Sequence, residues 1–188
     1  MSTEQVTRTD PRYAATTGTQ SFDPVPRVLA ATRIGLGLVF LWAFADKLFG
    51  LGYATKSASA WINGGSPTKG FLGGVDHGPL ASVFRSWAGQ PWADWLFMAG
   101  LLGVGAALVL GVGLRVAAIA GTAMMLLMWA AEWPLDRFTD AGEATRSTNP
   151  LLDYHLVYAA LLVVLVMTKA GDMWGLGRQV AGRSPWLR

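Results

Sequence analysis

Residues 92–133 read WADWLFMAGLLGVGAALVLGVGLRVAAIAGTAMMLLMWAAEW, and this stretch decides the fold. It contains two apolar segments, 92–114 and 116–133, which are joined only through the residues GLR at 113–115. Each segment approaches the ~20 apolar residues with which a helix crosses a hydrocarbon core of about 30 Å. Because the junction has room only for a tight turn, we predict an antiparallel hairpin of two membrane-spanning helices.

Two further apolar segments, 28–50 and 151–169, complete a set of four. The sequence therefore predicts an all-α integral membrane four-helix bundle in which the first and second helices are joined by a long interfacial loop. Within this loop, the Gly and Pro residues of WINGGSPTKGFLGG (61–74) exclude one continuous helix. PLASVFRSWAG (79–89) has the apolar spacing of a short amphipathic helix. The pattern leaves open whether the loop lies on the interface or re-enters the membrane.

The composition agrees with a membrane protein. Hydrophobic residues make up 52% of the 188 residues and charged residues only 14%, whereas soluble domains carry roughly 25% charged residues. The 23 glycines and nine tryptophans are also typical of membrane helices and their interfaces. The chain has no cysteine, which excludes disulfide exchange, thiolate catalysis and cysteine-ligated iron–sulfur clusters within this chain. Basic, aromatic-interleaved motifs for nucleic-acid binding are missing.

The ends of the chain suggest an orientation. We predict a disordered cytoplasmic tail at 1–27, a transmembrane domain at 28–177 and a short cytoplasmic tail at 178–188. No apolar run follows Met1 directly, so a cleaved signal peptide is not expected. Four spans place both termini on one side, and nine of the 15 Lys and Arg residues fall on that side. The positive-inside rule then predicts a multi-pass protein of the cell membrane with both termini in the cytoplasm.

Small residues on the first two spans predict close helix packing. The first span carries Gly35 and Gly37, and the second carries Gly100, Gly103, Gly105, Gly111 and Gly113. Glycines let two backbones approach closely in a membrane. The same residues could equally mediate a homo-oligomer, and the sequence does not distinguish these uses.

Four ionisable residues are the candidate catalytic groups. Asp46 ends the first span, Glu132 ends the third, and Asp153 and His155 begin the fourth. In the predicted topology all of them reach the outer face. A charged side chain in a membrane usually faces the protein interior and has a partner there. We therefore expect these groups to converge in one layer.

Each of these residues also has a simpler interpretation. Glu132 could extend into outer water, Asp153 could cap a helix start, and His155 could be a packing residue. On a helix, Asp153 and His155 would be about 200° apart and could not both face the bundle centre. Lys47, beside Asp46, can reach the lipid headgroups with its long side chain.

Aromatic residues surround the predicted polar layer and favour a quinone as its ligand. The candidate ring-binding residues are Trp42, Trp129, Tyr154 and Tyr158. A flat, lipid-soluble ring whose two oxygens exchange protons suits such a pocket. Imidazole and carboxylate groups are suitable proton partners for quinone reduction or quinol oxidation.

Other cofactors and functions have less support. A metal held by Asp46, Glu132, Asp153 and His155 is permitted by residue type, but their spacing is not diagnostic and no metal is predicted. The main alternative is a non-catalytic assembly or interaction subunit, in which the polar groups only fix helix packing. A small transporter or channel is disfavoured, because inverted repeats and broken spans are not evident.

Several stretches resemble one known family. FADKLFG (44–50), GGSPTKGFL (64–72), the segment 91–121 and NPLLDYHLVYAALLV (149–163) look like the DoxX/DoxD family of small four-helix membrane proteins. The similarity covers roughly residues 28–177. It implies a membrane redox assembly similar to thiosulfate:quinone oxidoreductase, with a partner redox subunit. Because the chain lacks cysteine, sulfur chemistry through a protein persulfide is in doubt.

Overall fold

The computed structural model describes residues 23–145 and 147–181, and in these residues the regular secondary structure is helical. Four helices form the body of the protein: α1 (Val25–Phe49), α4 (Pro91–Leu110), α5 (Leu114–Glu132) and α6 (Tyr154–Met167). The loop after α1 carries η2 (Ser57–Ser59), η3 (Trp61–Asn63), α2 (Lys69–Gly73) and α3 (Ala81–Trp87). After α6 come η4 (Ala170–Asp172) and α7 (Gly177–Ala181).

Among the described residues, three helices are long and apolar enough to cross a membrane, namely α1, α4 and α5 with 25, 20 and 19 residues. The predicted membrane protein is therefore supported, but the expected fourth span is only partly present. Helix α6 has 14 residues, which corresponds to about 21 Å at 1.5 Å per residue. Residues 151–153 are not helical, and the chain leaves the helix at Thr168.

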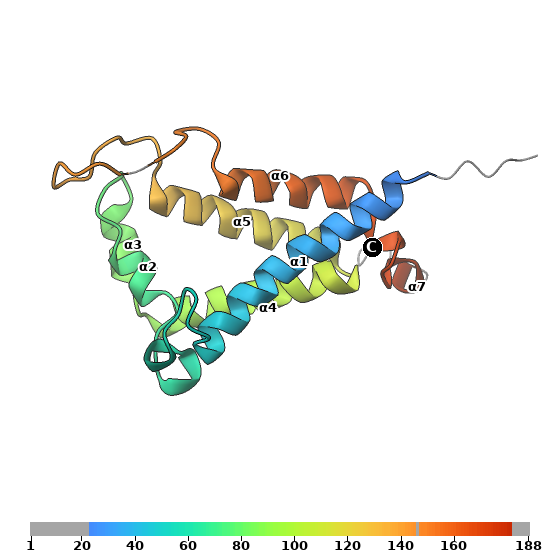
Figure 1. The fold of residues 1–188 in the computed structure, drawn as a ribbon, viewed down its shortest axis with the longest axis horizontal. Helices are drawn as coiled ribbons and strands as arrows, with labels where there is room; N and C mark the ends of the chain where they lie inside the picture. The colour runs from blue at the N-terminus through green and yellow to red at the C-terminus, as the bar shows by residue number, and fades with distance from the viewer. Residues whose placement is uncertain (1–22, 146, 182–188) are drawn as a thin grey trace, which may run out of the picture.

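The predicted hairpin is confirmed between α4 and α5. Gly111 and Gly113 both have positive φ angles, 70° and 68°, which let the chain reverse within three residues. Helix α1 packs mainly on α4, and α5 packs on both α4 and α6. Figure 1 shows that the α1–α4 pair and the α5–α6 pair diverge toward the end of the molecule that carries α2 and α3.

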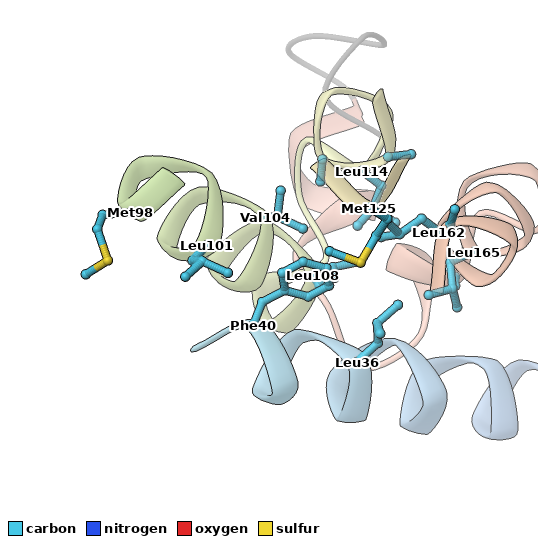
Figure 2. Packing of buried hydrophobic residues seen from close by; sticks show 14 residues of the cluster. Leu36, Phe40, Met98, Leu101, Val104, Leu108, Leu114, Met125, Leu162 and Leu165 are labelled. Atoms are coloured by element: carbon cyan, nitrogen blue, oxygen red, sulfur yellow. The ribbon is translucent and has the colours of Figure 1, made fainter. Parts of the chain in front are cut away.

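The core lies where all four long helices meet. Figure 2 shows Leu36 and Phe40 of α1 facing the side chains of α4, with Met125 of α5 and Leu162 of α6 completing the cluster. The outer surface is also apolar. Leu96, Ile119 and Met167 are 66%, 74% and 77% exposed, a pattern that fits lipid and is unfavourable in water.

Only some of the predicted glycine contacts hold. A Cβ atom on Gly37 would lie 2.9 Å from Leu108 Cβ and 3.0 Å from Gly105 O, so α1 and α4 touch closely there. Gly35 and Gly103 have nothing within 4 Å of such an atom. The prediction of close packing is therefore right for Gly37 and Gly105 and wrong for Gly35, Gly103 and Gly113, where such an atom would meet nothing within 4 Å.

A buried arginine joins the first helix to the C-terminal segment. Arg33 is 0% exposed, and its guanidinium donates hydrogen bonds to five backbone carbonyls. They belong to Leu108, Val109, Ala170, Met173 and Trp174. The first two lie at the C-terminal end of α4, where the helix dipole favours a cation. Arg33 is thus an internal clamp between three segments.

The long loop packs against the end of α5. Val75, Ala81 and Phe84 form a second apolar cluster with Ala131 of α5. The predicted amphipathic helix exists as α3, although Leu80 and Val83 of its expected apolar face point outward, 44% and 40% exposed. The predicted tail 1–27 lies mostly outside the described residues, as does most of 178–188. Where they are described, residues 25–27 belong to α1 and Gly177–Ala181 to α7.

Candidate functional site

Asp46 is a buried residue of α1 whose hydrogen bonds go to the following loop. Its side chain is 2% exposed, and its two oxygens accept hydrogen bonds from the backbone N–H groups of Tyr53 (3.3 Å) and Ala54 (3.1 Å). This carboxylate therefore holds the chain where it turns away from α1. In the described part of the chain it makes no hydrogen bond with α5 or α6, so the predicted convergence does not include Asp46.

Asp94 has a comparable role at the start of α4. One of its oxygens accepts hydrogen bonds from the Ser66 hydroxyl (2.9 Å), the Thr68 N–H (3.0 Å) and the Thr68 hydroxyl (2.6 Å). The two buried carboxylates on the α1–α4 pair thus both fix the loop 51–90.

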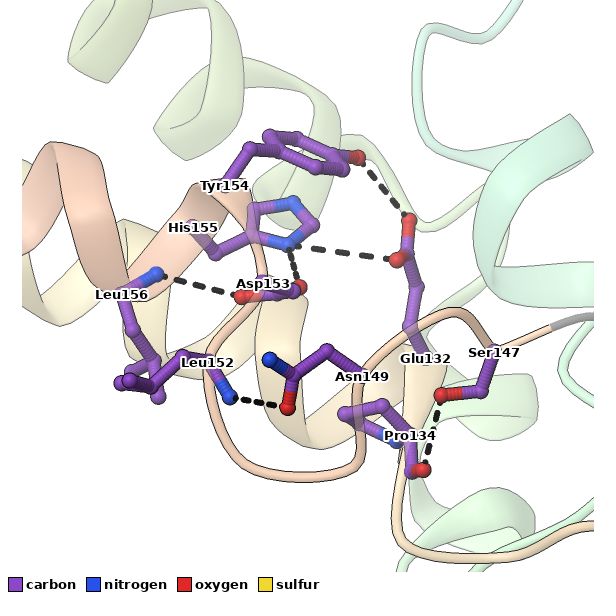
Figure 3. Close-up of polar contacts among 9 residues, drawn as sticks. All are labelled: Glu132, Pro134, Ser147, Asn149, Leu152, Asp153, Tyr154, His155 and Leu156. Atoms are coloured by element: carbon purple, nitrogen blue, oxygen red, sulfur yellow. Dashed lines mark hydrogen bonds and ion pairs between the residues drawn. The ribbon is translucent and has the colours of Figure 1, made fainter.

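The other predicted groups do converge, in what we call the α5–α6 cluster: Glu132, Asp153, Tyr154 and His155 (Figure 3). The Tyr154 hydroxyl donates to Glu132 Oε1 at 3.2 Å. The imidazole Nδ1 of His155 lies 2.7 Å from Asp153 Oδ2 and 3.9 Å from Glu132 Oε2. The end of α5 and the start of α6 therefore bring two carboxylates, a phenol and an imidazole together.

Asp153 caps α6 and binds His155 at the same time. Its Oδ1 accepts from the backbone N–H of Leu156 at 3.2 Å, and its own backbone is extended, with φ −99° and ψ −178°. The expected separation of about 200° from His155 assumed that both residues are helical. Because Asp153 precedes the helix, its side chain can turn back to the imidazole.

His155 has one partnered and one unpartnered ring nitrogen. The residue is 0% exposed. Its Nδ1 faces Asp153, whereas its buried Nε2 has no hydrogen-bond partner among the described residues. An Nδ1–H donor to the carboxylate leaves the lone pair on Nε2. The arrangement is therefore a carboxylate–imidazole dyad with a nitrogen free to accept a proton.

The predicted aromatic residues fall into two groups. Tyr154 lies against the His155 ring, with centroids 4.0 Å apart, and its centroid is 6.1 Å from that of Tyr158. Trp129 contacts Trp133 at 5.8 Å, and its indole N–H is buried without a partner among the described residues. Trp42 is instead 50% exposed and contacts Tyr53 of the loop. The structure does not bring Trp42 to the cluster.

A cavity of about 380 Å³ lies between α4 and α5, beside α2 and α3. Its walls are almost entirely apolar, with aromatic side chains from Phe71, Phe84, Trp87, Trp92 and Phe97. No residue of the α5–α6 cluster lines it. The cavity reaches Met128, however, and Glu132 follows one turn later on α5, about 6 Å along the axis.

Lys47 enters this cavity. Its Nζ lies 5.8 Å from the centroid of the Phe97 ring, within the range of a cation–π contact. That Lys47 reaches the headgroups stays a prediction, while its side chain also lines the cavity. The α3 spacing was the one sequence signal of this cavity, because it predicted that Phe84 and Trp87 share an apolar face.

Three residues of the cluster could also hold a metal ion. Each residue offers one ligand atom, and these atoms of Glu132, Asp153 and His155 lie within 4.8 Å of one another. This set matches the group that the sequence permitted, except that Asp46 is not part of it. Carboxylate and imidazole ligands suit several divalent ions.

Comparisons with models of protein families, with curated proteins and with solved structures found no match to the chain. The resemblance to the DoxX/DoxD family thus rests on the quoted sequence stretches alone.

Proposed function

We propose that this chain is a quinone-interacting membrane protein, the DoxX/DoxD-like subunit of an oxidoreductase, and that its α5–α6 cluster exchanges protons with the quinone. The observation that carries the proposal is the dyad of Asp153 and His155, whose buried Nε2 has no hydrogen-bond partner among the described residues. Quinone reduction takes up two protons and quinol oxidation releases them. A neutral imidazole oriented by a carboxylate is a suitable acceptor for such a proton.

The neighbouring groups support proton exchange. Glu132 lies 3.9 Å from the imidazole and accepts a hydrogen bond from the Tyr154 hydroxyl. A proton on His155 would therefore have a carboxylate on two sides, from Asp153 and from Glu132. Glu132 thus offers a second site for a proton beside the imidazole.

The cavity supplies the space for a ring. Pockets for small molecules typically measure ≈ 300–1,000 Å³ and are mostly apolar, and the cavity of about 380 Å³ meets both criteria. Its aromatic walls suit a flat ring. The ligand would thus lie one helical turn from Glu132.

The electrons would come from elsewhere. With no cysteine and only two histidines, the chain has no evident ligand set for an iron–sulfur cluster or a bis-histidine haem. We therefore assign a partner redox subunit to this function. In the same proposal α6 completes a four-helix bundle in the cell membrane, with both termini in the cytoplasm.

The first test is whether the purified protein contains quinone. Protein in detergent is extracted with organic solvent, and the extract is analysed by mass spectrometry. The proposal expects a bound quinone, or tight binding of added decylubiquinone. Protein that neither retains nor binds a quinone would reject it.

The second test concerns His155. In membranes that contain the chain and its redox partner, His155→Gln should abolish quinone reduction while the Kd of decylubiquinone stays close to that of wild type, because the imidazole lies outside the cavity wall and would exchange protons without anchoring the ring. His77→Gln is the matched control, since His77 lies in the loop and contacts Asp76. Equal rates of quinone reduction in both variants would contradict the role of His155.

One observation favours the alternative of a non-catalytic assembly subunit. The carboxylates of Asp46 and Asp94 accept hydrogen bonds from the loop. Buried charged groups in this protein can therefore have a purely structural role. This alternative expects Asp46→Asn to lower the melting temperature in a protein that binds no quinone.

A further inference from the structure

The proposed function assigns no role to Lys47, although this residue has an unusual environment. It belongs to α1, and its side chain lines the cavity between α4 and α5. Among the described residues it makes no hydrogen bond or salt bridge, and its one ring contact is with Phe97 at 5.8 Å. An ammonium group carries three hydrogen-bond donors. These donors face a cavity whose walls are almost entirely apolar.

The neighbouring polar groups of the cavity are already engaged. Asp46 precedes Lys47 in sequence, but its oxygens accept from the loop backbone at Tyr53 and Ala54. Thr68, the other polar residue of the wall, donates its hydroxyl to Asp94 at 2.6 Å. The lysine is thus the one charged group of the cavity wall in the described chain, and it makes no hydrogen bond to a wall residue there. The Thr68 oxygen accepts from the Gly89 N–H instead, and Asp46 balances part of the ammonium charge without a direct ion pair.

An ammonium in such surroundings is stabilised when a ligand brings an acceptor. A charged donor facing an apolar space loses solvation, and a hydrogen-bonding oxygen offsets this loss. We infer that Lys47 binds an oxygen atom of the cavity's ligand, namely one ring carbonyl of a quinone. This inference rests on the proposed function and adds the residue that anchors and orients the ring.

The position of Lys47 also determines how the quinone ring is oriented in the cavity. Lys47 approaches from the C-terminal end of α1, whereas Glu132 lies beyond Met128 at the C-terminal end of α5, and Figure 1 shows these two helix ends diverging. A ring with opposite oxygens can present one oxygen to the ammonium and the other toward the α5–α6 cluster. The cavity would then hold the quinone with a cationic donor at one end and proton acceptors beyond the other.

The test measures binding of decylubiquinone to the full chain in detergent. Quinones quench tryptophan fluorescence, and Trp87 and Trp92 line the cavity. Lys47→Met should raise the Kd by about tenfold or more, since a hydrogen bond to a charged group contributes roughly that factor. Lys47→Arg should keep most of the affinity. Lys56→Met, at an exposed loop lysine, is the control and should leave the Kd unchanged.

A second pair of variants locates the ligand. Ala123 lines the cavity, whereas Ile119 on the same helix is 74% exposed. Ala123→Trp should abolish binding and Ile119→Trp should not. The bis-methyl ether of decylubiquinol, which lacks the carbonyls, should bind wild type and Lys47→Met equally weakly. Melting temperatures in detergent verify that each variant is folded.

The outcomes separate the two proposals. If wild type binds no decylubiquinone, both fall. If Ala123→Trp abolishes binding while Lys47→Met leaves it unchanged, the anchoring role of Lys47 is overturned and the proposed function stands. If mass spectrometry finds a phospholipid that decylubiquinone does not displace and that only Lys47→Met releases, the ammonium binds a lipid phosphate, and its assignment to a quinone carbonyl is overturned.

Discussion

Replacement of Arg33 by methionine should strongly destabilise the protein. The side chain is 0% exposed and donates to five backbone carbonyls. Methionine has a similar length and no charge, so the change removes the donors and leaves the packing largely intact. It also avoids the separate cost of an unpaired buried charge. The remaining effect is that the backbone carbonyls at the end of α4 and after α6 lose their hydrogen-bond donor.

The magnitude follows from these bonds. Hydrogen bonds to charged groups contribute about 1.5–3 kcal/mol each, but five on one guanidinium share its charge and some carbonyls have other donors. The N–H of Gly111, for example, also reaches Leu108 O at 3.3 Å. We therefore expect a loss of about 3 kcal/mol, well below the sum of five independent hydrogen bonds to a charged group. For a domain of this size the melting temperature should fall by about 6–12 °C.

Thermal unfolding in detergent, followed by near-UV circular dichroism, measures this change. Trp174 accepts one of the bonds through its carbonyl, so its surroundings should loosen first. Arg33→Lys should give an intermediate loss, because an ammonium has three donors and no planar fork. Lys56→Met, in the exposed part of the loop, is the control. A melting temperature of Arg33→Met equal to that of the control would refute the clamp.

Three further predictions test other contacts of the structure. Asp46→Asn should expose the loop to protease, since an amide replaces one of the two oxygens that accept from Tyr53 and Ala54; unchanged proteolysis would contradict this role. Gly37→Leu should cost about 1–3 kcal/mol by overpacking against α4, whereas Gly103→Leu should melt like wild type because nothing lies within 4 Å of its Cβ position. Tyr154→Phe should change stability by less than about 1 kcal/mol, since the lost bond to Glu132 is exposed, and a larger fall in melting temperature would show that the bond supports the α5–α6 junction.

The sequence predicted the parts of the fold that depend on composition and length. The apolar runs located α1, α4 and α5, and the short GLR junction predicted the hairpin. The extent of α6 was overestimated, because apolar residues at 151 and 152 count toward a span whether or not their backbone is helical. Asp153 begins the helix as its cap, and an apolar count does not detect that boundary.

The site was predictable where it depends on neighbouring residues. Asp153, Tyr154 and His155 are consecutive, and Glu132 ends the helix that packs on α6, so their meeting follows from an antiparallel pair. Asp46 could not be placed in this way. Its partners are backbone N–H groups in a loop without a repeating pattern, and their direction depends on the whole loop conformation.

The cavity was not predicted, for a related reason. Its wall combines side chains from α2, α3, α4 and α5 with Lys47 of α1. The spacing of apolar residues along the chain does not show how those elements approach one another. For the same reason the sequence did not show that Trp42 lies beside Tyr53 of the loop and apart from the α5–α6 cluster.

The Arg33 clamp also constrains how the protein is made. Three of its five acceptors lie 137, 140 and 141 residues further along the chain, so α1 emerges from the ribosome long before they are synthesised. The hydrogen bonds of Arg33 to Ala170, Met173 and Trp174 can therefore form only after the residues that follow α6 have been synthesised. Until then α1 and α4 can pack on each other, but the guanidinium lacks three of its five acceptors.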